Sequence, residues 1–166
     1  MRIQIQKRPL KSWRAFYGRR EVAVSSQFDS EKFGRFTRIR RVWAVGAIHG
    51  EATKLEALHE QLARKIQTGD KLAYLGNFMG WGQTVLRTID ELLLFRRQLL
   101  AVPRMHNCDI AYLRGQQEEM WHKMLQLHLA VGPAEVLEWM LEQGLRATLK
   151  AYGGDENMAL RQARSG

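Results

Sequence analysis

The sequence contains a single cysteine, Cys108, among 166 residues. One cysteine excludes an internal disulfide and a cysteine-based zinc site, so we expect a semi-buried apolar side chain in a reducing compartment. The chain also lacks any apolar run of about 18 residues, the length that a transmembrane helix needs. No apolar signal segment follows the basic N-terminus, and we expect a cytoplasmic protein. An organelle-targeting role for the Arg-rich residues 1–20 stays open.

Acidic residues are scarce in the first quarter of the chain. Residues 1–41 contain twelve Lys or Arg and three Asp or Glu, whereas residues 42–166 contain fourteen of each, so the net charge of +9 resides in the first segment. We expect a basic arm at 1–41 and one domain at 42–166. The arm predicts contact with nucleic acid, anionic lipid or an acidic protein face. The arginines proposed for this contact are Arg19, Arg20, Arg38, Arg40 and Arg41.

Aromatic side chains lie between the basic residues of the arm. Such a mixture can hold a phosphate backbone and stack on bases, but aromatics also pack an arm onto its own body. The charge evidence favours packing over nucleic-acid binding. A solvated tail that keeps the protein soluble is the third interpretation.

Strand-like and helix-like patterns alternate after residue 41. Residues 42–47 resemble a strand buried on both faces, and further strands are expected at 71–75 and 110–113. Apolar residues at helical spacing predict helices over 51–67 and about 84–99, and again after each later loop. Pro103 ends the second helix, and Pro133 begins another one. This order predicts an α/β fold with a mainly parallel sheet flanked by helices, and functional loops at the carboxyl ends of the strands.

Three glycine-rich loops follow the predicted strands. They read Gly46-Ala47-Ile48-His49-Gly50, then Gly76-Asn77-Phe78-Met79-Gly80-Trp81-Gly82, then Gly115-Gln116-Gln117-Glu118. The series resembles the signatures G-D-x-H-G, G-D-x-x-D-R-G and G-N-H-E of calcineurin-like metallophosphoesterases, above all the bacterial serine/threonine phosphoprotein phosphatases. The resemblance covers residues 42–154. It implies the N-terminal half of a metallophosphoesterase fold, whose second sheet has no counterpart here.

The departures from these signatures fall on the chemistry that the resemblance implies. Ala47 replaces an aspartate ligand, and Asn77 replaces the aspartate that bridges two metals. Gln116 and Gln117 replace a ligand and the general acid, Gly80 replaces the carboxylate that orients this acid, and Trp81 replaces an arginine that holds phosphate. His49 is the one ligand-type residue retained.

A two-metal site needs carboxylates to offset and bridge the cations. We therefore expect no catalytic residue, no metal and no other cofactor. His59, His106, His122 and His128 are interpreted as satisfied or surface histidines, and a metal at His106-x-Cys108-Asp109 is the weaker alternative.

The remaining groups at the predicted site allow two interpretations. Backbone N–H groups at 46–50 and 115–117 could hold an anion with help from Arg114 and His49. Alternatively, the glycines persist because the turns require them, and Met79 and Trp81 make the site more apolar, which suits contact with a protein. The second interpretation is favoured.

We therefore expect an inactive phosphatase-like protein, a pseudophosphatase that acts as a scaffold or regulatory subunit for a protein partner. A weak metal-dependent phosphoesterase and a binder of RNA or lipid through the arm are the alternatives. Because half of the family fold is absent, one face of the sheet should lack its usual cover. A dimer or a tightly bound partner is expected to cover it.

Overall fold

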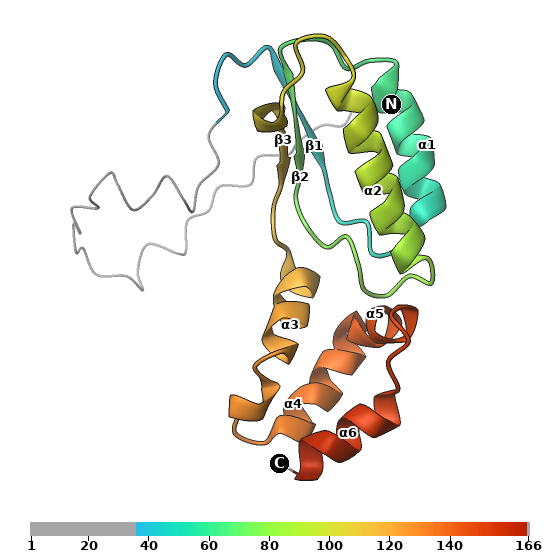
Figure 1. Cartoon of the computed structure of the whole chain (residues 1–166), viewed down its shortest axis with the longest axis vertical. Helices are drawn as coiled ribbons and strands as arrows, with labels where there is room; N and C mark the ends of the chain where they lie inside the picture. The colour runs from blue at the N-terminus through green and yellow to red at the C-terminus, as the bar shows by residue number, and fades with distance from the viewer. Residues whose placement is uncertain (1–35, 166) are drawn as a thin grey trace, which may run out of the picture. The chain divides into compact units, whose positions relative to one another are not determined.

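The computed structural model describes residues 36–165, which belong to one compact unit (Figure 1). Six residues that were assigned to the basic arm, 36–41, are thus part of the folded body. The elements, in chain order, are β1 (Arg41–Val45), α1 (Ala52–Ala63), β2 (Asp70–Tyr74), α2 (Val85–Leu100), η1 (Asn107–Asp109), β3 (Ile110–Tyr112), α3 (Gln116–Met124), η2 (Leu127–Leu129), α4 (Pro133–Met140), η3 (Leu141–Leu145), α5 (Arg146–Ala151) and α6 (Glu156–Ser165).

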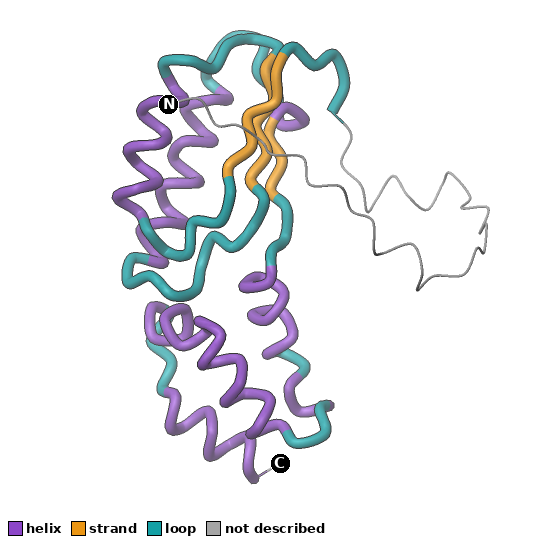
Figure 2. The backbone as a smooth tube through the Cα atoms, turned by 180° about the vertical axis from the view of Figure 1, so that it is seen from behind, coloured by secondary structure: helices purple, strands orange, loops and turns teal. Residues whose placement is uncertain are grey.

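The strands form one parallel sheet in the order β1-β2-β3. Helix α1 connects β1 to β2 and α2 connects β2 to β3, and the two helices lie side by side along the sheet (Figures 1 and 2). The predicted α/β fold with a parallel sheet and flanking helices is therefore confirmed. The three strands are the only sheet within residues 36–165.

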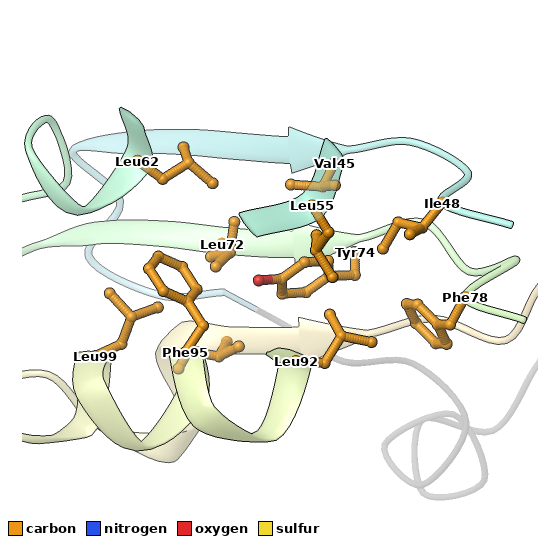
Figure 3. Close-up of a cluster of buried hydrophobic side chains, with 11 residues drawn as sticks. Val45, Ile48, Leu55, Leu62, Leu72, Tyr74, Phe78, Leu92, Phe95 and Leu99 are labelled. Atoms are coloured by element: carbon orange, nitrogen blue, oxygen red, sulfur yellow. The ribbon is translucent and has the colours of Figure 1, made fainter. Parts of the chain in front are cut away.

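The core lies between the sheet and these two helices (Figure 3). Strand β2 is buried along its whole length because it is the central strand. Tyr74, the last residue of β2, is fully buried in this core and stacks on Tyr112 with ring centroids 4.9 Å apart. Helix α2 contributes Leu92, Phe95 and Leu99, whose spacing of three and four residues places them on one face. Leu86 and Leu93, which also follow the helical spacing of apolar residues, are about half exposed at 45% and 48%.

Strand β1 differs from its prediction. It was expected to be buried on both faces, but Val42 and Ala44 are exposed. Successive side chains of a strand point to opposite faces, and the helices α1 and α2 cover only the face that receives Trp43 and Val45. Leu75 and Leu113 are likewise exposed just beyond β2 and β3. The predicted partly uncovered sheet is thus present in the part of the chain that the structure describes.

The chain beyond β3 is helical. Met120, Met140 and Leu145 form a second small core between α3, α4 and η3. The helix that begins at Pro133 is interrupted at Gly144, where φ is +103°, and the chain resumes as α5. None of the helices described is both long and apolar enough to cross a membrane.

Two local predictions need correction. The first helix ends at Ala63 and not at residue 67, because the N–H groups of Lys65 and Ile66 both turn back to the carbonyl of Leu62. Cys108 is exposed in the short turn η1 and not semi-buried.

A buried carboxylate fastens the start of the sheet. Asp70 has no exposed surface and accepts hydrogen bonds from the Arg41 guanidinium (2.8 and 3.1 Å), the Trp43 indole N–H (3.1 Å) and the Gln67 backbone N–H (3.0 Å). Burial acts to raise the pKa of Asp70, but the hydrogen bonds from these three groups outweigh it and lower the pKa to about 2. A second buried pair, Lys71 with Asp109, joins β2 to η1.

We predict that Asp70→Asn removes a defined part of the pH dependence of stability. The pKa falls from 3.8 in the unfolded chain to about 2 in the folded one, so the ionised group stabilises the fold fully above about pH 4. This contribution, about 2 kcal/mol, is lost as the pH falls through 2. Urea unfolding from pH 7 to 2 should show the difference between wild type and variant shrinking below pH 4. Glu138→Gln, which breaks only the exposed pair with Arg164, should change little.

Candidate functional site

The three glycine-rich loops meet at the carboxyl edge of the sheet, as expected for parallel strands. The first loop is bound to the second through its backbone. The N–H groups of Ile48 and His49 both donate to the carbonyl of Asn77, at 2.9 and 2.8 Å, and Gly50 N–H donates to Phe78. In return, Gly82 N–H donates to the His49 carbonyl at 2.8 Å. The first two loops therefore form one hydrogen-bonded unit.

Glu118 fastens the second loop to the third. One of its carboxylate oxygens accepts from the N–H groups of Asn77 (2.7 Å) and Gly115 (2.9 Å), and the other accepts from Phe78 N–H (2.8 Å). The loops approach so closely that a Cβ on Gly76 would lie 2.2 Å from the nitrogen of Gly115. This contact requires glycine, which supports the structural interpretation of the loop glycines.

The positions that were predicted to be degenerate ligand sites lie where the three loops meet, and we call this region the loop junction. Ala47 is exposed and lines a small recess at the start of α1. His49 has a left-handed backbone with φ of +53°, and its buried Nδ1 has no partner among the described residues. Asn77 uses its side-chain oxygen to accept from Gln117 N–H at 3.0 Å. The junction therefore presents one imidazole and one amide oxygen that is already hydrogen-bonded.

The side chain of Gln117 packs against the bare backbone of Gly80. Gln117 is buried and donates from Nε2 to the Gln143 carbonyl at 2.7 Å, whereas Gln116 beside it is exposed. A Cβ on Gly80 would lie 2.3 Å from the Oε1 atom of Gln117, so the glutamine amide occupies the space that a side chain at position 80 would need. The two departures from the family signatures thus fit each other sterically.

Trp81 is the most prominent side chain of the second loop. It is 58% exposed, and its φ of +55° is costly for a bulky residue. The backbone N–H of Trp81 donates to the Gly144 carbonyl at 3.3 Å, and the backbone N–H of the preceding Gly80 donates to the Thr148 hydroxyl at 3.0 Å. A Cβ on Gly144 would lie 2.8 Å from the indole ring, so the ring is held against a bare stretch of backbone.

An open cavity of about 590 Å³, the Trp81 pocket, lies beside this indole. Leu141, Ala147 and Ala151 give it an apolar wall, and Glu142, Arg146 and Lys150 add charge. Sequence reasoning missed this pocket because its far wall comes from η3 and α5, which are 60 or more residues away from Trp81 in the chain. Met79, in the same loop, is half-buried.

The arginines that were predicted to contact an anionic partner have different surroundings in the structure. Arg114 is exposed and pairs with Glu119 at 3.3 Å. Arg40 and Arg41 both pair with the buried Asp70, so they have a structural role, whereas Arg38 is exposed. Arg19 and Arg20 lie outside the described residues, as do the aromatic residues of the arm before Phe36.

Backbone N–H groups offer little to an anion at the junction. Those of Ile48, His49, Gly50, Gly115 and Gln117 already donate within the loops. Within residues 36–165, no three His, Cys, Asp or Glu side chains are grouped so that they could hold a metal ion. These backbone N–H groups are therefore used within the hydrogen-bonded loops.

The four remaining histidines are either hydrogen-bonded in the core or exposed, as the sequence analysis expected. His59 is buried, bonded through Nδ1 to Glu91 (2.5 Å) and through Nε2 to the Tyr74 hydroxyl (2.8 Å), and stacked on Phe95. Burial lowers its pKa, although Glu91 opposes this effect. The other three, His106, His122 and His128, are exposed. His59 is therefore a satisfied core residue.

No family model, no curated protein and no solved structure matches this chain.

We predict that Glu118→Gln loosens the loop junction. The amide loses the charge that strengthens three hydrogen bonds, and its NH₂ group would face backbone N–H donors. The free energy of unfolding should fall by about 2 kcal/mol or more. Urea denaturation measures this, and Glu119→Gln is the matched control, because that neighbouring carboxylate makes only exposed ion pairs. Equal effects of the two variants would contradict the role given to Glu118.

We also predict that Gly144→Ala is destabilising for two separable reasons. The left-handed φ strains alanine, at about 1 kcal/mol, and the new methyl group collides with the indole of Trp81. Gly153→Ala reports the strain alone, because its φ is +78° and no atom lies within 4 Å of the added Cβ. Gly144→Ala should therefore lose more stability than Gly153→Ala, and the excess should shrink in a Trp81→Ala background. Additive effects in this double-mutant cycle would contradict the contact.

Proposed function

We propose that this chain is a catalytically inactive metallophosphoesterase-like protein, a pseudophosphatase, that binds a protein partner through its loop junction. One observation carries the proposal. The three loops meet at the sheet edge and are held together by Glu118, and both Glu118 oxygens, the Asn77 side-chain oxygen and the Gln117 Nε2 group already make hydrogen bonds there. Two buried side-chain atoms, His49 Nδ1 and Gln117 Oε1, have no partner among the described residues. The loops thus offer one imidazole nitrogen without a partner among the described residues, and the Glu118 carboxylate is already used.

The absence of suitable ligands argues against hydrolysis. Ala47 has no donor atom, the Asn77 side-chain oxygen already accepts from Gln117, and both oxygens of Glu118 accept backbone N–H groups. Divalent cations need charged oxygen ligands that are free to bind them. A single imidazole at His49 would bind such a cation weakly. The Gln117 side chain cannot donate a proton as a general acid.

Trp81 supplies a positive argument for protein binding. Tryptophan is enriched among residues that dominate the affinity of protein interfaces. Here the indole is more than half exposed, yet its backbone is held in a strained conformation by hydrogen bonds on both sides. A strained residue persists when its surroundings enforce it, and such residues gather at functional sites. The Trp81 pocket beside it gives an incoming side chain a place to bind.

Contact with RNA or lipid through the basic arm remains a separate hypothesis. Arg40 and Arg41 contribute less to it than their charge implies, because both pair with Asp70. It therefore depends on Arg38 and on residues outside the described part of the chain. Its signature would be affinity that falls steeply with salt.

We predict that Trp81→Ala abolishes capture of the protein partner from nuclease-treated lysate, while Trp139→Ala leaves it intact. Trp139 is a matched control, because it is a half-exposed tryptophan on α4 and does not line the Trp81 pocket. Both variants should unfold at the wild-type temperature if exposed rings alone are removed. Capture that is lost on nuclease treatment would instead assign binding to the arm.

Purified wild-type protein also tests the prediction that the chain has no phosphatase activity. Wild type should neither bind Mn²⁺ in calorimetry nor hydrolyse an aryl phosphate. The double variant Ala47→Asp, Asn77→Asp should remain inactive, because it restores two carboxylates without an acid at Gln117. Turnover by wild type that disappears in His49→Ala would contradict the proposal and favour a weak phosphoesterase.

A further inference from the structure

Helix α6 contacts the rest of the body through a narrow apolar stripe. None of its residues is buried, and its half-buried apolar side chains are those of Ala159, Leu160 and Ala163. The helix lies beside α4 (Figure 1), yet Ala159 and Ala163 line an open cavity of about 490 Å³ whose other walls include parts of α3, η2, α4 and α5. Side chains that face an open space lack contact atoms there, so apolar packing holds α6 only weakly.

The link between α5 and α6 is closed by hydrogen bonds on each side. The N–H groups of Gly153 and Gly154 donate back to carbonyls of α5, at 3.0 and 2.9 Å, and so complete the end of that helix. Asp155 begins α6, because its carboxylate accepts from the Met158 N–H at 2.9 Å. Within residues 36–165, no backbone hydrogen bond joins α6 to another element. Rotation between Gly154 and Asp155 would therefore leave both helices intact.

Two ion pairs attach α6 to its neighbours. Arg146 of α5 donates to both carboxylate oxygens of Glu156, at 2.6 and 2.9 Å, and Arg164 donates to Glu138 of α4 at 2.9 Å. In the described part of the chain, these are the only hydrogen bonds between α6 and the rest of the body. All four side chains are substantially exposed. Exposed ion pairs contribute little stability and are screened by salt.

One of these ion pairs uses a residue of the Trp81 pocket. Arg146 lines that pocket together with Glu142 and Lys150. A guanidinium that makes two hydrogen bonds to one carboxylate has a strong and specific partner. While α6 is in place, the Arg146 group that would bind a carboxylate of a ligand is therefore already bound to Glu156.

We propose that α6 is a strap that opens as one unit at Gly154, and that its opening frees Arg146 at the Trp81 pocket. In the closed state Glu156 is an internal competitor for this arginine. In the open state Arg146 can bind an acidic side chain of a protein that occupies the pocket, and such a protein stabilises the open state in return. The use of the freed arginine by a partner rests on the proposed function, whereas the opening of α6 does not.

Hydrogen exchange of the full chain, followed by mass spectrometry, measures the opening. A helix of ten residues is marginal in water without tertiary contacts, so the amides of α6 should exchange whenever the strap is open. Exchange in α6 should become faster as the salt concentration rises to about 1 M, because salt screens both ion pairs. Exchange in α1, which is held by buried apolar side chains, should not respond.

Glu138→Gln tests whether α6 opens as one unit. This variant removes the ion pair with Arg164 and leaves the pair between Arg146 and Glu156 unchanged. Exchange in α6 should rise about threefold, the effect expected of one exposed ion pair. The rate at which phenylglyoxal modifies Arg146 should rise by a similar factor. The unfolding transition should stay close to that of wild type, since the opening is local.

Two controls accompany this variant. Glu56→Gln breaks an exposed ion pair with Arg87, which joins α1 to α2, and should change neither readout. Arg114, in its exposed pair with Glu119, serves as the reference arginine within each sample.

Three outcomes would overturn the proposal. They are exchange in α6 that does not respond to salt, a Glu138→Gln variant with faster exchange but unchanged reactivity of Arg146, and an equal response in Glu56→Gln. The second outcome would mean that α6 frays from one end and does not open as a unit. Neither readout requires the protein partner, so a failure of the strap and a failure of the Trp81→Ala capture experiment are separate results.

Discussion

The loop junction depends on the carboxylate of Glu118. Three backbone N–H groups from two loops point at it, and no other described side chain accepts from them. Without this acceptor the second and third loops would carry buried donors without partners, each costing about 1–3 kcal/mol. The first loop is bound to the second by backbone hydrogen bonds alone, so its position follows from theirs. One charged side chain thus joins the loops after β2 and β3, and backbone hydrogen bonds attach the loop after β1 to them.

The sequence predicted the parts of this arrangement that depend on local pattern. Alternating strand-like and helix-like segments gave the α/β order, and glycines marked where the loops lie. Glu118 itself could be found, because a glutamate three residues after Gly115 is the spacing of a helix-capping carboxylate. The close approach of Gly76 to Gly115 could not be found, since it joins segments that only the sheet brings together.

The errors have a common physical origin. Val42 and Ala44 were taken as buried because an apolar run resembles a central strand, but β1 is an edge strand with helices on one face only. Leu86 and Leu93 share the helical spacing of the apolar residues in α2, yet the buried stripe of this helix is centred on Phe95. Periodicity identifies a helix and its approximate face. Which of two neighbouring stripes is buried depends on the partner element, which the pattern does not contain.

The fit between Gly80 and Gln117 ties the third loop to the helical part of the chain. A site that holds carboxylates and histidines for metals is destabilised when the metals are absent, because like charges are then held close together. Here a neutral amide fills the space above a glycine and donates to the Gln143 carbonyl, so the third loop is tied to the helical part without any ion. This amide adds no like charge to the junction, although its Oε1 atom is buried without a partner among the described residues. Trp81 is the exception, since its strained backbone and exposed ring stabilise nothing within the described residues beyond their contact with Gly144. A glycine at position 81 would avoid this backbone strain, and the exposed indole is therefore the group on which we base the proposed contact with a protein.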